Sequence, residues 1–260
     1  MTLNGVAGST PPLTSVNRAL DVLEALAGDP GSSLTQLATR LKMPKATTRR
    51  LLINLMARGY VDQDPDSRAY RLGLRCWQLG AAAVGTLDVR IKAREELERV
   101  ADSTGEQATL WVYSEGYAVC VDRVESRQPV RSYTQLGSRE PAVLLSAGRC
   151  LLASRSATEV DRAVAEAVAS GLIDDDRRAA LAAHLAQVTE RRFDISQGDR
   201  WPDMSACAAP IRDYRGVAVA AIGISGPSTR LVPDLLGEYA LRLRDVADQL
   251  SGFDAADVRS

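Results

Sequence analysis

Residues 43–61 read MPKATTRRLLINLMARGYV, and this stretch decides the fold of the first part of the chain. Pro44 suits the first turn of a helix, and Gly59 suits the point where that helix ends. Because successive helical residues are rotated by about 100°, the side chains fall on two faces. The face that must pack on other helices holds Thr48, Leu51, Leu52 and Leu55. The opposite face holds Ala46, Thr47, Arg50 and Asn54, with Arg49 on its flank and Lys45 near the helix start.

Two helices are expected before this one, and a hairpin after it. Ser15 can cap the first helix, and Ser33 can cap the second, with Gln36 completing a capping box. Two short strands are expected at residues 60–63 and 70–72. Three helices followed by a two-stranded hairpin are typical of a winged helix-turn-helix.

The charge of the chain is unevenly distributed. The 260 residues carry a net charge of −1, which by itself disfavours a nucleic-acid protein. Residues 1–75 alone carry +4, whereas the remaining 185 residues carry −5. Between Pro30 and Val61 there are six basic residues and no acidic one. A basic segment joined to an acidic body indicates a nucleic-acid module attached to a second domain.

In a helix-turn-helix the exposed N-terminal part of the last helix enters the major groove of DNA. We expect Ala46 to lie on that surface and Thr47 and Arg49 to reach base edges. Lys45, Arg50 and Arg68 are placed for phosphates, with Arg68 at the tip of the wing. A solvated basic face on a winged helix that binds another protein is the alternative.

The rest of the chain has an α+β pattern. Residues 74–84 read as a linker helix interrupted by Gly80 and Gly85. Further helices are expected at 88–105, 146–154, 158–170, 175–190 and from Pro233 onward. Strands are expected at 109–113, 117–124, 130–133, 206–211 and 216–224.

Composition excludes several classes of protein. The hydrophobic fraction of 45% and the charged fraction of 25% are ordinary globular values. Four cysteines without a CxxC pair exclude a zinc ribbon and fit reduced thiols in the cytoplasm, the expected location. The start of the sequence lacks the basic and apolar regions of a signal peptide, so none is expected, and the longest apolar run, 217–224, is too short to span a membrane. Residues 1–12 read as a disordered arm.

Several motifs together resemble the IclR family of bacterial transcriptional regulators. The resemblance covers about residues 13–252 and rests on the order and spacing of the motifs. In the first part they are SVNRALDVL at 15–23, LTQLA at 34–38, MPKATTRRLL at 43–52, GYV at 59–61 and YRLG at 70–73. In the second part they are DRVE at 122–125, AAPI at 208–211 and SGP at 225–227.

The resemblance implies a winged helix-turn-helix at 13–74, a linker helix at 75–87 and a GAF/PAS-like effector-binding domain of α+β fold at 88–252. It also implies a homodimer or dimer of dimers on a palindromic operator in double-stranded DNA, tuned by a small organic acid. Carried across residue by residue, the family's effector pocket selects Glu140, Ser146, Ala147, Ser196, Ala206, Gly223 and Ser225.

Two segments depart from the family pattern. Residues 141–149 read PAVLLSAGR where a Leu-His segment ending in Gly-Lys is common. Gly198-Asp199 stands where a pair of Glu residues is common, and Ala206 stands where Cys is frequent. Leu144 and Leu145 suit an effector with a larger apolar part, and core packing explains them equally well.

The sequence offers no catalytic constellation, so we expect no enzyme, no cofactor and no metal site. The one histidine, His184, is interpreted as a solvated surface residue, and the run 174–176 as favourable charge at a helix N-terminus. Cys120 and Cys150 are expected to be buried structural thiols, with redox sensing as the alternative. All three tryptophans, Trp77, Trp111 and Trp201, suit a core, and Trp201 also suits a lid over the pocket.

Two functions therefore compete. The first is a ligand-responsive transcription factor, with repression expected rather than activation. The second is a redox- or ligand-sensing signalling module that acts through protein–protein contacts. The acid-free run between Pro30 and Val61 favours the first.

Overall fold

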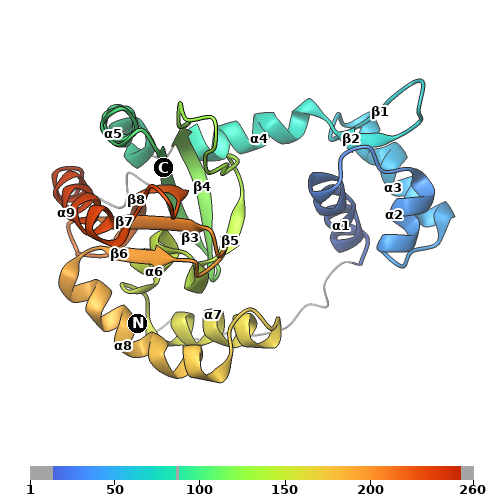
Figure 1. Cartoon of the computed structure of the whole chain (residues 1–260). Coiled ribbons are helices and arrows are strands. Elements are labelled where there is room, and N and C mark those ends of the chain that lie inside the picture. The colour runs from blue at the N-terminus through green and yellow to red at the C-terminus, as the bar shows by residue number, and fades with distance from the viewer. Residues whose placement is uncertain (1–13, 86–87, 253–260) are drawn as a thin grey trace, which may run out of the picture. The chain divides into compact units, whose positions relative to one another are not determined.

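The computed structural model describes residues 14–85 and 88–252 (Figure 1). The expected arm at residues 1–12 lies outside them, as do residues 86 and 87 of the expected linker. Internal contacts divide the chain into two compact units, one ending at Ala83 and the other starting at Val84. Within the described residues, no helix is both long enough and apolar enough to cross a bilayer.

The first unit contains the expected helices and hairpin. Its elements are α1 (Thr14–Gly28), α2 (Leu34–Arg40), α3 (Lys45–Ala57), β1 (Val61–Gln63) and β2 (Tyr70–Leu72). The predicted capping box of α2 is confirmed, since Ser33 and Gln36 exchange both hydrogen bonds. A small core joins the three helices to the hairpin and includes Val22, Leu26, Leu37, Leu52 and Val61. These contacts fix the fold of a winged helix-turn-helix.

Helix α4 (Leu74–Gly85) differs from the expectation in two ways. It runs through Gly80 without a break, because a single glycine costs an exposed helix only about 1 kcal/mol. Trp77 is 65% exposed rather than part of a core. The helix contacts the hairpin region through its first turn, where the Cys76 thiol donates to the Tyr60 carbonyl oxygen, and residues 77–83 are exposed to solvent.

The second unit is built on one antiparallel sheet. Its elements are α5 (Asp88–Thr104), β3 (Gln107–Ser114), β4 (Tyr117–Val124), β5 (Arg139–Pro141), the 3-10 turn η1 (Ala142–Leu144), α6 (Ser146–Leu152), α7 (Ala157–Ala169), α8 (Asp175–Arg191), β6 (Asp194–Gln197), β7 (Met204–Arg212), β8 (Ala218–Pro227) and α9 (Pro233–Gln249). The six strands lie in the order β5-β4-β3-β8-β7-β6. The hairpins β3–β4 and β7–β8 are confirmed as predicted.

Alternate residues of the strands serve two separate cores. Leu110, Ile211 and Ile222 point to one face of the sheet, where they pack with residues of α5 and α9. Trp111 and Ala208 belong to the cluster on the other face, which is covered by α6. A third cluster joins η1 to α7 and α8. Because both faces are covered, nearly the whole central part of the sheet is buried.

The predicted strand at 130–133 is wrong. The backbone of β4 pairs instead with β5, a three-residue strand that the sequence pattern did not indicate. Residues 125–138 form an irregular segment that the side chain of Gln107 holds in place, its Oε1 accepting from the backbone N of Thr134 at 3.1 Å. Strand β6 was also not predicted. Short edge strands carry too few residues for an alternating pattern to be visible.

We predict that Gly148→Ala destabilises the protein and that Gly237→Ala does not. A Cβ at Gly148 would lie 2.2 Å from the backbone oxygen of Ala142, so α6 and η1 would have to separate. The expected loss is about 1–3 kcal/mol, or roughly 2–4 °C in melting temperature per kcal/mol for a chain of this size. A Cβ at Gly237 in α9 meets nothing within 4 Å, so alanine there should stabilise the helix slightly. Equal melting temperatures for the two variants would contradict this packing.

Candidate functional site

Helix α3 presents a cationic surface. Lys45, Ala46, Arg49 and Arg50 are exposed, and Thr47 is half-buried at the edge of that surface. The opposite face is fixed as expected, because Thr48 and Leu52 are buried. The Thr48 hydroxyl donates to the backbone oxygen of Pro44 at 3.2 Å, which satisfies its polar group without a solvent contact. Three cationic side chains therefore project from one side of the first two turns of α3.

The tip of the hairpin holds Arg68 on the surface. Arg68 is exposed and has a positive φ of 59°, as a tight turn requires. Asp64 organises this turn, since its Oδ1 accepts from the backbone N of Ser67 at 2.8 Å and from the Ser67 hydroxyl. These hydrogen bonds from Ser67 lower the pKa of the Asp64 carboxyl. The turn is thereby locked in a shape that directs the arginine outward.

A cavity of about 270 Å³ opens beside the sheet of the second unit. All seven residues selected by the family resemblance line it, although they come from five elements. They are Glu140 of β5, Ser146 and Ala147 of α6, Ser196 of β6, Ala206 of β7, and Gly223 and Ser225 of β8. The fold thus brings together residues that lie up to 85 positions apart in the sequence.

The wall of the cavity is mainly apolar. Trp111, Leu145 and Met204 supply the large side chains. The indole nitrogen of Trp111 donates to the Thr109 hydroxyl at 2.9 Å, so this tryptophan needs no polar partner from a ligand. A compact apolar molecule can therefore be enclosed at this site without leaving the indole unsatisfied.

Sequence reasoning missed several residues of the cavity. Trp111, expected in the core, is 6% exposed and lines the cavity as well. Trp201, expected in a core or as a lid over the pocket, is 47% exposed and lines the cavity. Arg200 and Ser132 were not selected at all, and they come from segments without regular structure. Their side chains could not be assigned to a wall from sequence because loops have no period that fixes a direction.

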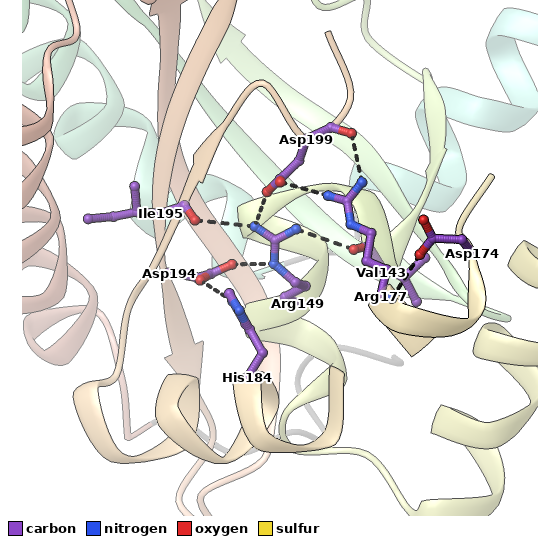
Figure 2. Close-up of polar contacts among 8 residues, drawn as sticks. All are labelled: Val143, Arg149, Asp174, Arg177, His184, Asp194, Ile195 and Asp199. Atoms are coloured by element: carbon purple, nitrogen blue, oxygen red, sulfur yellow. Dashed lines mark hydrogen bonds and ion pairs between the residues drawn. The ribbon is translucent and has the colours of Figure 1, made fainter. Parts of the chain in front are cut away.

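A buried arginine of α6 connects this helix to other segments near the cavity. Figure 2 shows Arg149 of α6 at the centre of a polar cluster, where its side chain is only 3% exposed. Its Nε donates to Asp194 Oδ2 at 2.5 Å, and its Nη2 donates to Asp199 Oδ2 at 2.9 Å. The same guanidinium also donates to the backbone oxygens of Val143 and Ile195. Every part of its donor fork is thus engaged with η1, β6 or the β6–β7 loop.

The interpretation of His184 as a purely solvated residue is wrong. Its Nε2 lies 2.7 Å from Asp194 Oδ1, and its side chain is 40% exposed (Figure 2). The Asp194 carboxylate therefore contacts both Arg149 of α6 and His184 of α8. The pairing escaped sequence analysis because the two residues lie on different elements. By contrast, the Asp174 side chain caps α8, accepting from the backbone N of Arg177 at 2.8 Å, as the acidic run predicted.

The cysteines have the environment of structural thiols. Cys120, Cys150 and Cys207 are buried, and no disulfide links them. Burial raises the pKa of Cys120 to about 12, and it also raises the pKa values of Cys150 and Cys207 well above the ordinary range. Nucleophilic and redox-sensing thiols need the opposite shift. Among the described residues, no three His, Cys, Asp or Glu side chains gather as a metal ion would need.

Comparison with known proteins gives matches over both units. Residues 15–65 match the model of the IclR helix-turn-helix domain, and residues 81–252 match that of the bacterial transcriptional regulator IclR C-terminal domain. The transcriptional regulator BhcR of Paracoccus denitrificans is 30% identical, covering 92% of this chain and 86% of that protein. The transcriptional repressor AllR of Escherichia coli is 29% identical, covering 91% and 89%. A crystal structure of an IclR regulator from Alicyclobacillus acidocaldarius superposes with a TM-score of 0.77 at 28% identity, covering 92% and 98%.

We predict that Arg149→Met destabilises the second unit by about 3–5 kcal/mol, because the buried Asp194 carboxylate would lose its arginine and Asp199 would keep only Arg177. The matched control is Arg192→Met, since Arg192 pairs with Asp248 at 2.8 Å on the surface, where both side chains are over 40% exposed. Removing that pair should cost less than about 1 kcal/mol. Chemical denaturation of the two variants measures the difference, and similar losses would show that the buried cluster is not a major support.

We also predict that a maleimide reagent at neutral pH modifies Cys76 and spares the other three cysteines of the native protein. Burial raises the pKa of all four thiols, but Cys76 is half-exposed and within reach of the reagent, whereas the other three are buried. Mass spectrometry should show one adduct on the folded chain and four after denaturation. Rapid labelling of Cys120 or Cys150 in the native protein would contradict this prediction and support the alternative that these thiols sense oxidants.

Proposed function

The chain belongs to the IclR family of bacterial transcriptional regulators. From this membership we propose a role for each part of the chain. It is a DNA-binding regulator and not an enzyme, as its family and relatives are. We assign DNA binding to residues 13–74, the connection to residues 75–87 and effector binding to residues 88–252.

The DNA-binding role is assigned to α3 and the hairpin tip. Thr47 and Arg49 read base edges, with Ala46 packed close to the groove. Lys45, Arg50 and Arg68 hold phosphates and so set the position of the helix without specifying a sequence. The exposure of the three cations of α3, in a helix without an acidic residue, supports this assignment.

The effector role is assigned to the cavity of the second unit. The observation that carries it is the convergence of Glu140, Ser146, Ala147, Ser196, Ala206, Gly223 and Ser225 on one apolar cavity. A small organic acid bound there shifts the population between two states of the protein that differ in operator affinity. The raised pKa values of the buried thiols remove the main support for a redox module.

The protein acts as a homodimer or a dimer of dimers on a palindromic operator, because a two-fold protein reads two half-sites of the same sequence. We place it in the cytoplasm, together with the DNA it binds. Repression is the expected mode, and the similarity to AllR, which is described as a repressor, supports it.

We predict that Arg50→Ala weakens binding to the DNA upstream of the protein's own gene and lowers the slope of log K against log salt by about 1. Arg49→Ala should cost about 1–3 kcal/mol and relax base preference at one position of each half-site. Fluorescence anisotropy at several salt concentrations measures both effects. Arg162→Ala, which removes an exposed cation of α7, is the control and should leave affinity unchanged. Binding that is independent of salt would contradict the assignment.

A further inference from the structure

The cavity contains a single pair of opposite charges. Among the residues that line it, only Glu140 and Arg200 carry charge, and Arg200 was not among the residues selected from sequence. The Arg200 Nε donates to Glu140 Oε2 at 3.0 Å. Both side chains are partly buried, 34% exposed for Arg200 and 20% for Glu140. Their pairing leaves the cavity neutral before any ligand enters.

The pairing uses only one edge of the guanidinium. Nε is engaged with Glu140, and within residues 14–85 and 88–252 neither Nη atom of Arg200 has a hydrogen-bond partner. The guanidinium carbon lies 5.1 Å from the centre of the Trp201 ring, so the side chain rests on an aromatic surface. Since a guanidinium carries five N–H donors, its Nη atoms can donate hydrogen bonds to a second carboxylate.

The same molecule shows this two-carboxylate arrangement at another arginine. Arg149 holds Asp194 through Nε at 2.5 Å and Asp199 through Nη2 at 2.9 Å (Figure 2). One guanidinium therefore satisfies two carboxylates inside this fold. Arg200 lines the cavity with the first of its two carboxylates in place and no partner on its Nη atoms among the described residues.

The backbone that carries Arg200 is firmly placed. The carboxylate of its neighbour Asp199 forms ion pairs with Arg149 and Arg177. The Arg177 Nη2 lies 2.6 Å from Asp199 Oδ1, and the Arg177 Nη1 donates to the backbone oxygen of Asp199. Gly198 precedes them with a φ of +73°, which a glycine adopts without strain. A charged side chain on such a support loses little freedom when it binds a ligand.

We propose that the Nη edge of Arg200 receives the carboxylate of the effector while Glu140 holds Nε. This inference rests on the assignment of the cavity as the effector site and adds the class of ligand. The ligand is a monocarboxylate with a compact apolar body, which fits the wall formed by Trp111, Leu145 and Met204. A second carboxylate has no cation left to pair with, and it would stand near Glu140. The buried Ser138 hydroxyl, which has no partner among the described residues, is available to the ligand as well.

The test is isothermal titration calorimetry of the full-length protein with four probes that share one ring: benzoate, benzamide, benzylamine and phthalate. Benzoate is expected to bind at least about 10-fold more tightly than the other three, because only its head group satisfies the Nη edge without adding an unpaired charge. Equal or tighter binding of benzamide, benzylamine or phthalate overturns the inference but leaves the cavity as an effector site. Failure of all four probes to bind overturns both.

Variants locate the binding atom. Arg200→Met should weaken benzoate about 10- to 100-fold, and Arg200→Lys should recover part of the loss because it restores the charge without the fork. Glu140→Gln should strengthen benzoate binding, since it removes the negative charge beside the ligand and keeps an acceptor for Nε. Arg139→Met is the matched control, because Arg139 adjoins Glu140 and stacks on Tyr117 but does not line the cavity.

The control should bind benzoate as the unmodified protein does. Circular dichroism and melting temperature verify that each variant is folded before its affinity is compared. Unchanged affinity for benzoate in a folded Arg200→Met protein would overturn the inference, and DNA binding, which is measured separately, would be unaffected by that result.

Discussion

One buried guanidinium holds together the part of the second unit that lies next to the cavity. Arg149 connects α6 to η1, to β6 and to the loop that follows β6, through two carboxylates and two backbone oxygens. Such a cluster costs desolvation energy, and the cost is offset because each of the three guanidinium nitrogens donates to at least one acceptor. The segments next to the cavity are consequently specified by direction-dependent contacts as well as by apolar packing.

The cavity itself follows from small side chains on the sheet. Ala206, Ala208 and Gly223 lie on β7 and β8 where the sheet borders the cavity. At Gly223 a Cβ would approach the backbone oxygen of Cys207 to 2.9 Å, so a larger residue does not fit. The helix opposite, α6, has only seven residues, which leaves part of this face to loops. A sheet that must be covered on both faces thereby keeps a space large enough for a small ligand.

The first unit was predictable almost element by element, because its signals are local. Ser33 and Gln36 form the predicted capping box of α2, and α3 has a buried face where one was predicted. In the second unit the long helices and the two long hairpins were predicted, but β5, β6 and the irregular segment at 125–138 were not. Their conformation depends on which strand they lie against, and a three- or four-residue segment does not encode that choice.

The sequence by itself determined the fold class, the family, the cationic face of α3 and the seven cavity residues that motif positions identify. The fold class and the exposed face of α3 follow from periodicity and capping, which are properties of neighbouring residues, whereas the family and the seven cavity residues are what the resemblance of the motifs to the IclR family implies. Only the tertiary structure decided that Glu140 pairs with Arg200 and that Asp194 is shared by Arg149 and His184. The partners in these pairs are 60, 45 and 10 residues apart and lie on different elements. Ion pairs of this kind have no sequence period, because the packing of the sheet and helices sets which charges meet.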